Sequence, residues 1–542
     1  MALTKVGGSV WDASTSKYTP AGTGAVTTNV QDKLRADVSV LDFIPEAAHA
    51  GIKARTSTTD VTTYIQAAID SFNGPGTVYF PAGRYYVTGT MYLKRSGVHL
   101  VGAGDTSTQI YFVNAAGGTV FAGDSDLGAS LNTYTDCAIR NMVIGTGVSA
   151  TAATNYDVGI NFTSFSYSTF DVQMSCYRTN GAMMEGQGNN GQSPYFSRFS
   201  SSKMIGSSTV TGVRFKAGLW AGGSPGPNAN VFSDFSRIAG CAIPFDIQFG
   251  HGNLFTNISV ESVHDAAFRL AYKAAADYTG TITGSITQIG FTDTAGIGVW
   301  GAVEFNNGAV KVTSGAGAGQ VRKIKTASTV TGAVGLEEPW AIVPSIGDTI
   351  ELYKPSAFGN KITNFRIEGL VTSSPNLIQA YPGATLNSST KWEVTSTGEV
   401  VSDDSGDVRN IWYSENRLVM TEIIENPGPS YSKDIYPRTS VLGGIKPAGN
   451  YVVEWVKVAA NTATLGDTCT VTLDSGGTAA GGGSPSIEAI LQNGFSQAMA
   501  ITGPGEKTPK DGTNNSIFLN VATGSSFSAT ADLVVTWCVT LV

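Results

Sequence analysis

Two glutamates end two stretches of the chain that share one pattern. In segments 255–261 (FTNISVE) and 362–368 (ITNFRIE), apolar and polar residues alternate, and Glu261 and Glu368 take the last position. Side chains on a strand alternate between its faces, so both carboxyl groups would point outward from neighbouring strands about 4.8 Å apart. Two carboxyl groups that close do not both ionise readily, so the pKa of one should rise.

A protonated carboxyl group beside an ionised one is the pair that glycoside hydrolysis uses. Carboxyl separations of about 5–5.5 Å suit a retaining reaction and about 6.5–9.5 Å an inverting one, so the stereochemistry stays open. Two more carboxylates are candidates: Asp265 follows Glu261 within one turn, and Asp171 faces outward beside Gln173 in the same column of aligned positions. The alternative is that the glutamates stack by chance on a polar surface, with Arg366 neutralising one of them.

A second outward row lies on the strand that follows, where the sequences VRFK, FDIQF and FRLAY align. Its polar members are Arg214, Lys216, Asp246, Gln248 and Arg269. Together with Arg366 and Gln173, such a row could bind the carboxylates and hydroxyls of a glycan. The alternation of sign from Arg214 to Asp246 to Arg269 favours cross-strand ion pairs instead.

Aromatic side chains are candidates for stacking on sugar rings. They are Trp220, Trp300, Trp340, Tyr195 and Tyr272. Trp220 is the best placed, because its glycine- and proline-rich loop can project from the body of the protein. A contact between subunits is the alternative for Trp220.

Six stretches of the chain align with one another, and this self-similarity indicates the fold that would position these residues. They begin at Ile139, Tyr167, Phe196, Phe232, Phe255 and Ile362, so the spacings are 28, 29, 36, 23 and then 107 residues. Repeats of about 20–50 residues built from short strands and turns are typical of solenoids. The sequence therefore predicts an all-β fold, a right-handed parallel β-helix. Asn141, Asp234, Asn257 and Asn364 share a column and predict a tight turn between two strands.

The 107-residue spacing predicts a small β domain inserted at residues 276–355, since removing about 80 residues restores a normal repeat of about 27. The β-helix itself is expected to span 31–386, after an N-terminal arm at 1–30 and with a helix from Asp60 to Phe72. Residues 387–440 are expected to be a connector, and 441–542 an antiparallel β-sandwich. The inserted domain is expected to lie beside the binding face, or to be a decoration or a subunit contact.

Composition excludes several classes of function. The net charge is −8 and no run of lysine or arginine occurs, so neither nucleic acid nor an anionic membrane is an expected partner. Five cysteines without a CxxC motif, and four histidines without metal-ligand spacing, predict no disulfide scaffold, no metal site and no cofactor. Cys176 and Cys241 are expected in an apolar core ladder. No signal peptide or membrane span is expected.

Four ordered motifs carry a resemblance to a known family. They are VQDKLRADVSVLDF at 30–43, YIQAAID at 64–70, GTVYFPAGRYYV at 76–87, and GVHLVGAG at 97–104 followed by Ile110. Together they resemble the opening of bacteriophage tailspikes with a pectate-lyase-like β-helix. One departure is that IPEAAHAGIKARTSTTD follows Asp42-Phe43, where many relatives have a Gly-Asp-Gly-x-x-Asp-Asp pattern.

The resemblance implies a homotrimer in the virion tail that recognises, and often cleaves, a polysaccharide on the surface of a bacterial host. It also implies that the arm docks onto another tail protein and that the C-terminal domain locks the trimer or binds sugar. The leading hypothesis is a depolymerase of capsule or lipopolysaccharide O-chain that hydrolyses glycosidic bonds. The rivals are a polysaccharide lyase using Arg214, Lys216 and Arg269, a glycan-binding adhesin without activity, and a bacterial cell-wall enzyme.

Overall fold

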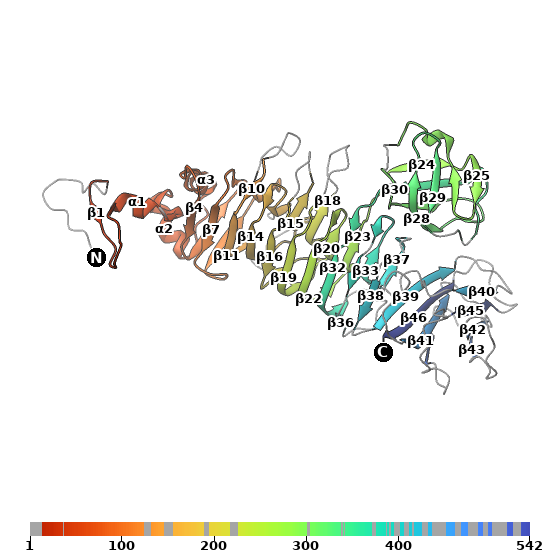
Figure 1. The fold of residues 1–542 in the computed structure, drawn as a ribbon. Helices are drawn as coiled ribbons and strands as arrows, with labels where there is room; N and C mark the ends of the chain where they lie inside the picture. Colours follow the sequence, from red (N-terminus) through yellow and green to blue (C-terminus); the bar gives the residue numbers. More distant parts are fainter. Residues whose placement is uncertain are drawn as a thin grey trace.

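The chain folds into a rod of stacked coils, which Figure 1 shows running from red to cyan in the computed structural model. The structure describes residues 14–35, 37–123, 132–145, 156–188, 194–216, 226–300, 304–337, 340, 342–370, 376–385, 387–389, 392–394, 401–405, 411–414, 417–424, 432–435, 451–460, 468–474, 486–490, 497–500, 518–523 and 533–541. Nearly all of its regular structure is β-strand, and the strands of the rod pair in parallel. The predicted fold, a right-handed parallel β-helix, is confirmed. The homotrimer stays a prediction.

Two long parallel sheets form the sides of the rod. The first sheet contains β3 (Asp37–Ser39), β4 (Gly76–Phe80), β5 (Gly83–Val87), β7 (Val98–Gly102), β8 (Thr108–Phe112), β11 (Ala138–Gly145), β14 (Thr169–Ser175), β16 (Arg198–Ser201), β17 (Met204–Ile205), β19 (Val231–Ala239), β22 (Leu254–Val263), β32 (Lys361–Leu370), β35 (Ser388–Ser389), β36 (Trp392–Val394) and β38 (Ile411–Ser414). The second contains β6 (Met91–Tyr92), β9 (Thr119–Ala122), β12 (Val158–Asn161), β15 (Ala182–Gln187), β18 (Thr211–Lys216), β20 (Ile243–Ile247), β23 (Ala266–Leu270), β33 (Asn376–Ala380) and β37 (Val401–Asp403).

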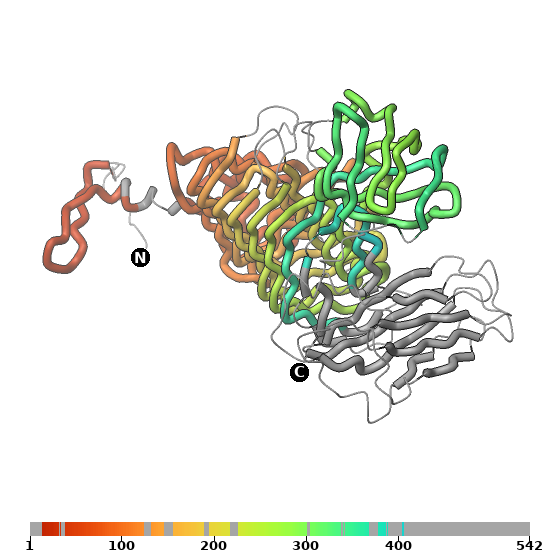
Figure 2. Tube along the Cα trace, turned by 45° about the vertical axis from the view of Figure 1, so that its right-hand side comes forward, coloured from red at the N-terminus to blue at the C-terminus, as the bar shows by residue number. Residues whose placement is uncertain are grey.

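A third, narrow side closes each coil. It consists of β10 (Tyr134–Thr135), β13 (Phe165–Ser166), β21 (Gly250–His251), β31 (Ala357–Phe358) and β34 (Ala384–Thr385). Isolated bridges from Tyr195 to Asn228 and from Asn228 to His251 carry this side through the intervening coils. The turned view in Figure 2 shows the coils stacked one behind another along the rod.

The register corrects two of the six aligned stretches. Phe170 pairs with Phe199, and Phe199 with Phe232, so these rings occupy the column that the alignment gave to Tyr167 and Phe196. Each of the two stretches has two aromatic residues three positions apart, so the sequence pattern allows either residue to be the one that points inward. The structure buries Phe170 and Phe199 and leaves the other two rings exposed.

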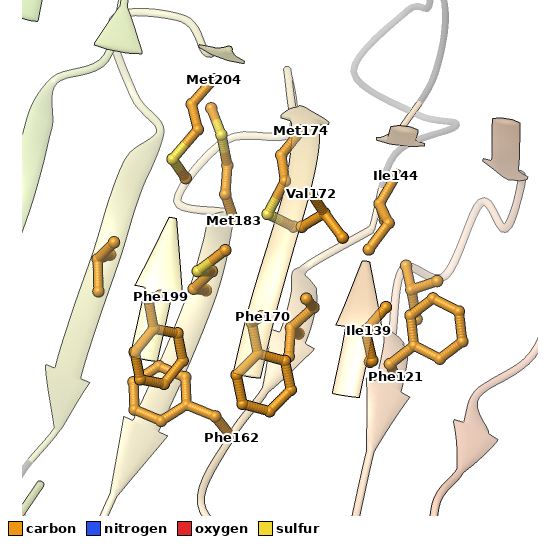
Figure 3. Close-up of a cluster of buried hydrophobic side chains, with 14 of the residues drawn as sticks. Phe121, Ile139, Ile144, Phe162, Phe170, Val172, Met174, Met183, Phe199 and Met204 are labelled. Atoms are coloured by element: carbon orange, nitrogen blue, oxygen red, sulfur yellow. The ribbon is translucent and has the colours of Figure 1, made fainter. Parts of the chain in front are cut away.

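Stacked aromatic rings fill the interior of the rod. Phe170 stacks on Phe199 with centroids 5.0 Å apart, Phe199 on Phe232 at 4.4 Å, and Phe232 on Phe255 at 5.1 Å. Figure 3 shows Phe170 and Phe199 side by side, with Phe162 next to Phe199 and with Met174, Met183 and Met204 farther along the same interior. One ring per coil at the spacing of the strands fixes the distance between coils and leaves no room for water.

A ladder of buried asparagines holds one corner of four successive coils. The Nδ2 of Asn230 donates to Oδ1 of Asn253 (3.2 Å), Asn253 to Asn360 (3.0 Å), and Asn360 to Asn387 (3.1 Å). In each case the same oxygen also accepts a backbone N–H of the preceding coil, at 3.1–3.2 Å. Ser168 and Ser197 continue the ladder toward the N-terminus with their hydroxyl groups. The side chains thus satisfy polar groups that the corner would otherwise bury unpaired.

The predicted column of Asn141, Asp234, Asn257 and Asn364 is present, but it is a bend and not a turn between strands. All four residues have left-handed φ, between 48° and 61°, and each lies inside one continuous strand. Asn and Asp tolerate this conformation better than other side chains. The Nδ2 of Asn257 donates to Asp234 and that of Asn364 to Asn257, both at 3.1 Å, so the exposed amides form a second ladder.

Short elements precede the rod. They are β1 (Lys17–Tyr18), β2 (Thr28–Asn29), α1 (Val30–Arg35), η1 (Val40–Asp42), α2 (Glu46–Lys53) and α3 (Thr62–Asp70). Helix α3 is shorter than the predicted 60–72, and Val61 is its N-cap residue. The Asp60 carboxylate still accepts the Thr62 N–H at 3.0 Å, and the Thr62 and Thr88 hydroxyls. Burial alone would raise the pKa of Asp60, but these hydrogen bonds lower it. Among the described residues, no helix is long and apolar enough to span a membrane.

A seven-stranded antiparallel sheet leaves the rod between β23 and β31, shown in green in Figure 1. Its strands are β24 (Tyr278–Thr281), β25 (Gly284–Thr287), β26 (Gly290–Thr292), β27 (Ala309–Val312), β28 (Val321–Ala327), β29 (Ala333–Leu336) and β30 (Thr349–Tyr353), with η3 (Thr294–Gly296) between β26 and β27. It has its own apolar core, which includes Trp300 and Trp340, each 4% exposed. Both indoles are therefore core residues and not sugar-stacking side chains.

Two antiparallel sheets follow the rod. One contains β39 (Arg417–Ile424), β41 (Tyr451–Ala460), β44 (Gln497–Ala500) and β46 (Leu533–Leu541). The other contains β40 (Ser432–Ile435), β42 (Thr468–Asp474), β43 (Ser486–Ile490) and β45 (Phe518–Thr523). Strand β39, which lies in the predicted connector, pairs with the last strand of the chain.

Removing one amide from the buried ladder should weaken the rod at that coil. We expect Asn253→Ala to lower the free energy of unfolding by about 2–4 kcal/mol, because it leaves partners on Asn230 and Asn360 buried and unpaired. The exposed ladder supplies the control, since Asn257→Gly keeps the left-handed bend and should cost less than about 1 kcal/mol. Thermal and urea unfolding measure both, and an equal effect of the two variants would contradict the prediction.

The three cysteines of the rod should be inert in the folded protein. Cys137, Cys176 and Cys241 are free and buried, and burial raises the pKa of the first two to about 11 and that of Cys241 to about 12. At pH 8 each should hold roughly a hundredfold less thiolate than a free cysteine. Alkylation followed by peptide mass mapping should therefore leave them unmodified until the protein is unfolded, and rapid native labelling would contradict this.

Candidate functional site

The register of the first sheet puts Glu261 beside Glu368. Strands β22 and β32 pair in parallel from Leu254↔Lys361 onward, and Glu261↔Glu368 is one of the pairs. The chain between the two residues contains the whole inserted sheet, yet the strands lie as neighbours in the rod. The Glu261 side chain is 27% exposed, so it is accessible from the outer face.

Arg237 is the cation that contacts Glu261. Its Nε lies 2.9 Å from Oε2 of Glu261, and its own side chain is 48% exposed. Strand β19 carries one extra residue between Phe235 and Ile238, which shifts its register against β22 by one position. The extra residue is visible in the sequence, because FSDFSRI is one residue longer than FTNISV. Arg366 is exposed and pairs in register with Ser259, and its neutralising of a glutamate stays a prediction.

Gln173 and Asp171 do not join this pair. The residues in register with Glu261 on earlier coils are Ala239, Ile205 and Ser175, so Gln173 lies two positions away from the predicted column. Its Nε2 donates to Ser202 at 3.0 Å, and the Ser202 hydroxyl donates to Asp105 at 3.2 Å. Asp171 pairs with Arg140 and Ser200, three strands before β22. The predicted column fails because the alignment of the stretch at Tyr167 was three residues out of register.

Asp265 lies at the corner between the two sheets and contacts Arg269 of the second sheet. It follows β22 at the corner, is 47% exposed, and lies 3.6 Å from Arg269. Arg269 in turn makes two short contacts with Asp246, Nε to Oδ1 at 3.0 Å and Nη2 to Oδ2 at 2.8 Å. Its guanidinium also lies over the Tyr272 ring, 4.3 Å from the centroid. Burial alone would lower the pKa of Arg269, but the hydrogen bond and charge of Asp246, and the charge of Asp265, raise it.

The second row is a ladder of alternating charge. Glu185, Arg214, Asp246 and Arg269 are in register on four successive strands. Glu185 is only 8% exposed and binds both Arg214 (3.2 Å) and Lys216 (2.8 Å). Asp246 is 1% exposed and also accepts from Gln248 at 2.8 Å. The predicted outward Asp246 is thus covered, and the cross-strand ion pairs, the alternative reading, describe the row.

Sequence reasoning missed Glu185, the buried carboxylate that ties Arg214 to Lys216. Its strand, AMMEGQ, is buried at every position, so it lacks the alternation that marked the other members of the row. Its spacing of 29 residues from Arg214 is a normal repeat and could have revealed it. Trp220 lies outside the described residues. Within the described part of the chain, no group of three or more His, Cys, Asp or Glu could hold a metal ion.

The two cations of the row should differ in what their loss costs. We expect Arg269→Met to lower the free energy of unfolding by about 3–5 kcal/mol, because it leaves Asp246 buried without its ion pair. Lys216→Met should cost under about 1 kcal/mol, since Lys216 is 42% exposed and Glu185 keeps Arg214. Thermal unfolding of both variants measures this. Unchanged stability of Arg269→Met with weaker polysaccharide binding would instead make Arg269 a substrate contact.

Comparison with known proteins gives a match over the first half of the rod. Residues 47–266 match the family described as rhamnogalacturonase A/epimerase, pectate lyase-like. No curated protein matches the sequence.

Similar solved structures include ORF18 of Geobacillus virus E2, 12% identical over 78% of this chain and 77% of that one, with a TM-score of 0.35. The tailspike protein of Acinetobacter baumannii phage AM24 is 11% identical over 98% and 86%, with a TM-score of 0.33. Tailspike gp49 of A. baumannii phage Fri1, a capsular polysaccharide depolymerase, is 12% identical over 98% and 93%, with a TM-score of 0.23. Likeness this distant says nothing of substrate. The predicted resemblance to the pectate-lyase-like β-helix is confirmed for residues 47–266.

Proposed function

We propose that this chain is a phage tailspike that binds a bacterial surface polysaccharide, capsule or O-chain, and depolymerises it by hydrolysing glycosidic bonds. The observation that carries the proposal is the register pair of Glu261 and Glu368 on neighbouring strands of a long rod. Along the rod, equivalent outward positions repeat once per coil. Such a regular surface suits an extended polymer better than a small molecule. The family match, described as a rhamnogalacturonase and epimerase family, agrees with an action on sugars.

The contacts of Glu261 suggest how the two carboxyl groups divide the work. Arg237 donates to Glu261 Oε2 at 2.9 Å and so holds that carboxyl group in place, and we assign Glu261 the role of base or nucleophile. Glu368 is then the acid that protonates the leaving oxygen. Arg366, exposed in the same part of the sheet, is assigned to binding the polymer.

The lyase alternative loses its predicted cations. β-Elimination needs a cation that neutralises the carboxylate of a uronic acid, in addition to a base. Arg214, Lys216 and Arg269 are each paired with a carboxylate of the protein, Glu185 or Asp246. The pairs of Arg214 and Arg269 are largely buried and costly to break, whereas the exposed Lys216 could leave Glu185 at little cost. Hydrolysis is therefore the reaction we favour.

We further propose the assembly that such a function requires. Three copies would form a homotrimer, with residues 441–542 locking it or binding sugar after a connector at 387–440. The arm at 1–30, which contains the β1–β2 hairpin, would attach the protein to another tail protein in the virion. The sheet inserted within 276–355 would lie beside the bound polymer. Sedimentation of the full chain tests the trimer.

Charge-removing variants test the catalytic pair. We expect Glu261→Gln and Glu368→Gln each to lower the rate of reducing-end release by about 10²–10⁴-fold, because each loses one proton-transfer or nucleophilic role. The matched control is Glu46→Gln, an exposed glutamate in α2, which should keep full activity. The substrates are a panel of purified bacterial capsular and O-chain polysaccharides, with products analysed by mass.

Three other outcomes would contradict this proposal. Full activity of both glutamine variants would clear the pair of a catalytic role. Products with an unsaturated sugar at the new non-reducing end, detected by ultraviolet absorbance, would show a lyase. Binding of a polysaccharide without release of any fragment would show an adhesin.

A further inference from the structure

The corner that precedes the asparagine ladder has left-handed backbone in six coils. Its residues and φ angles are Asp136 (56°), Tyr167 (52°), Phe196 (52°), Ala229 (51°), Gly252 (63°) and Gly359 (63°). Glycine adopts this conformation without strain, whereas a bulky aromatic side chain is rare there and costs free energy. The rod nevertheless keeps aromatic residues at this corner in two adjacent coils. Strain of this kind is typical of positions retained for function.

The two strained aromatic residues form an exposed cluster with a third ring. Tyr167 is 52% and Phe196 57% exposed, and their rings stack with centroids 5.3 Å apart and planes 28° from parallel. Tyr195 meets both rings edge-on, at 5.4 Å from Tyr167 and 5.5 Å from Phe196. These contacts fix the direction of the rings, so the cluster is rigid before any ligand arrives.

The stack ends at Phe196 because the corner residues that follow are small. Ala229 offers one methyl group, and Gly252 and Gly359 offer none. Among the residues that the structure describes, a Cβ atom added at Gly252 would meet only the backbone N of Ala229, at 3.9 Å, and one added at Gly359 only the N of Gly252, at 3.8 Å. In the described part of the chain, the next coils, about 4.8 Å apart, therefore leave an open step beside Phe196.

We propose that this step is a carbohydrate subsite, in which a pyranose ring stacks through its C–H face on Phe196 and lies over Ala229 and Gly252. The sugar takes the position that a further ring of the stack would occupy. Tyr195 and Asn228, which pair on the narrow side of the rod, supply polar groups for its hydroxyls. The subsite deepens the proposed function and rests on it, since it would bind another part of the same polymer.

The extent of the cluster favours a sugar over a second copy of the chain. A contact between two parallel rods would run along the corner and need bulky apolar residues on coil after coil. At this corner position the bulky apolar residues lie in two coils, with Asp136 before them and Ala229, Gly252 and Gly359 after them, and the stack of His251 on Phe358 belongs to the neighbouring column. Two coils span about 5 Å, which is the scale of one sugar unit and too short for a stable protein interface.

Two opposite substitutions test the subsite, one that removes the platform and one that fills the step. Both are made in the Glu261→Gln background, so that the polymer is not cut, and binding is measured on an immobilised panel of purified bacterial capsular and O-chain polysaccharides. We expect Phe196→Gly to weaken binding at least tenfold while the melting temperature stays about the same, because relieved backbone strain offsets lost ring contacts. We expect Ala229→Tyr to weaken binding similarly, because its ring extends the stack into the step.

The control is Tyr79→Ala, which removes an exposed tyrosine (40%) from β4 and should leave binding unchanged. Parental binding by both corner variants would overturn the subsite, and Ala229→Tyr alone decides if Phe196→Gly fails to fold. A changed oligomeric state in light scattering with binding retained would make the cluster a subunit contact and overturn it too. If the corner variants bind like the Glu261→Gln parent, and the wild type cleaves the polymer, only this inference fails. If the parent binds no polysaccharide and the wild type cleaves none, the proposed function fails with it.

Discussion

One buried side-chain ladder sets the spacing and phase of the coils. Each corner of a β-helix turns the chain through a tight angle and leaves backbone N–H and C=O groups without strand partners. Asn230, Asn253 and Asn360 satisfy these groups, because each amide accepts from the coil before it and donates both to the next amide and to a backbone carbonyl. A slip of one residue would leave the whole corner unsatisfied, so the ladder fixes which residues become neighbours on the outer faces.

The glutamate pair depends on this constraint. Asn253 and Asn360 are hydrogen-bonded across the inserted sheet, and the same 107-residue offset relates Glu261 to Glu368. The asparagines at the corner therefore fix the register of β22 against β32, and with it the pairing of the two glutamates eight residues further along each strand. Arg237 contacts Glu261 because β19 has one extra residue, which shifts its register against β22 by one position. The candidate site thus combines a strictly repeated position with one departure from the repeat.

The sequence predicted the repeat and its interruption but not every register. Alternation and spacing sufficed for stretches such as 255–261 and 362–368, where only one apolar residue fits each inward position. They failed at Tyr167 and Phe196, since an aromatic residue three positions later fits the interior equally well. Burial decides between such residues, and burial depends on the neighbouring coils. The same limit hid Glu185, whose strand is covered on both faces and shows no alternation.

The inserted sheet begins and ends at a single carboxylate. Asp277 forms an ion pair with Lys273 before the sheet, and the same oxygen accepts the backbone N–H of Lys354 after it. The two ends of the excursion are thereby clamped together, and the rod resumes at Ala357 on the rung that follows Gly250. Because its two ends are held together, the inserted sheet could be replaced by another domain with the same anchor, and the coils of the rod on either side would stack as before.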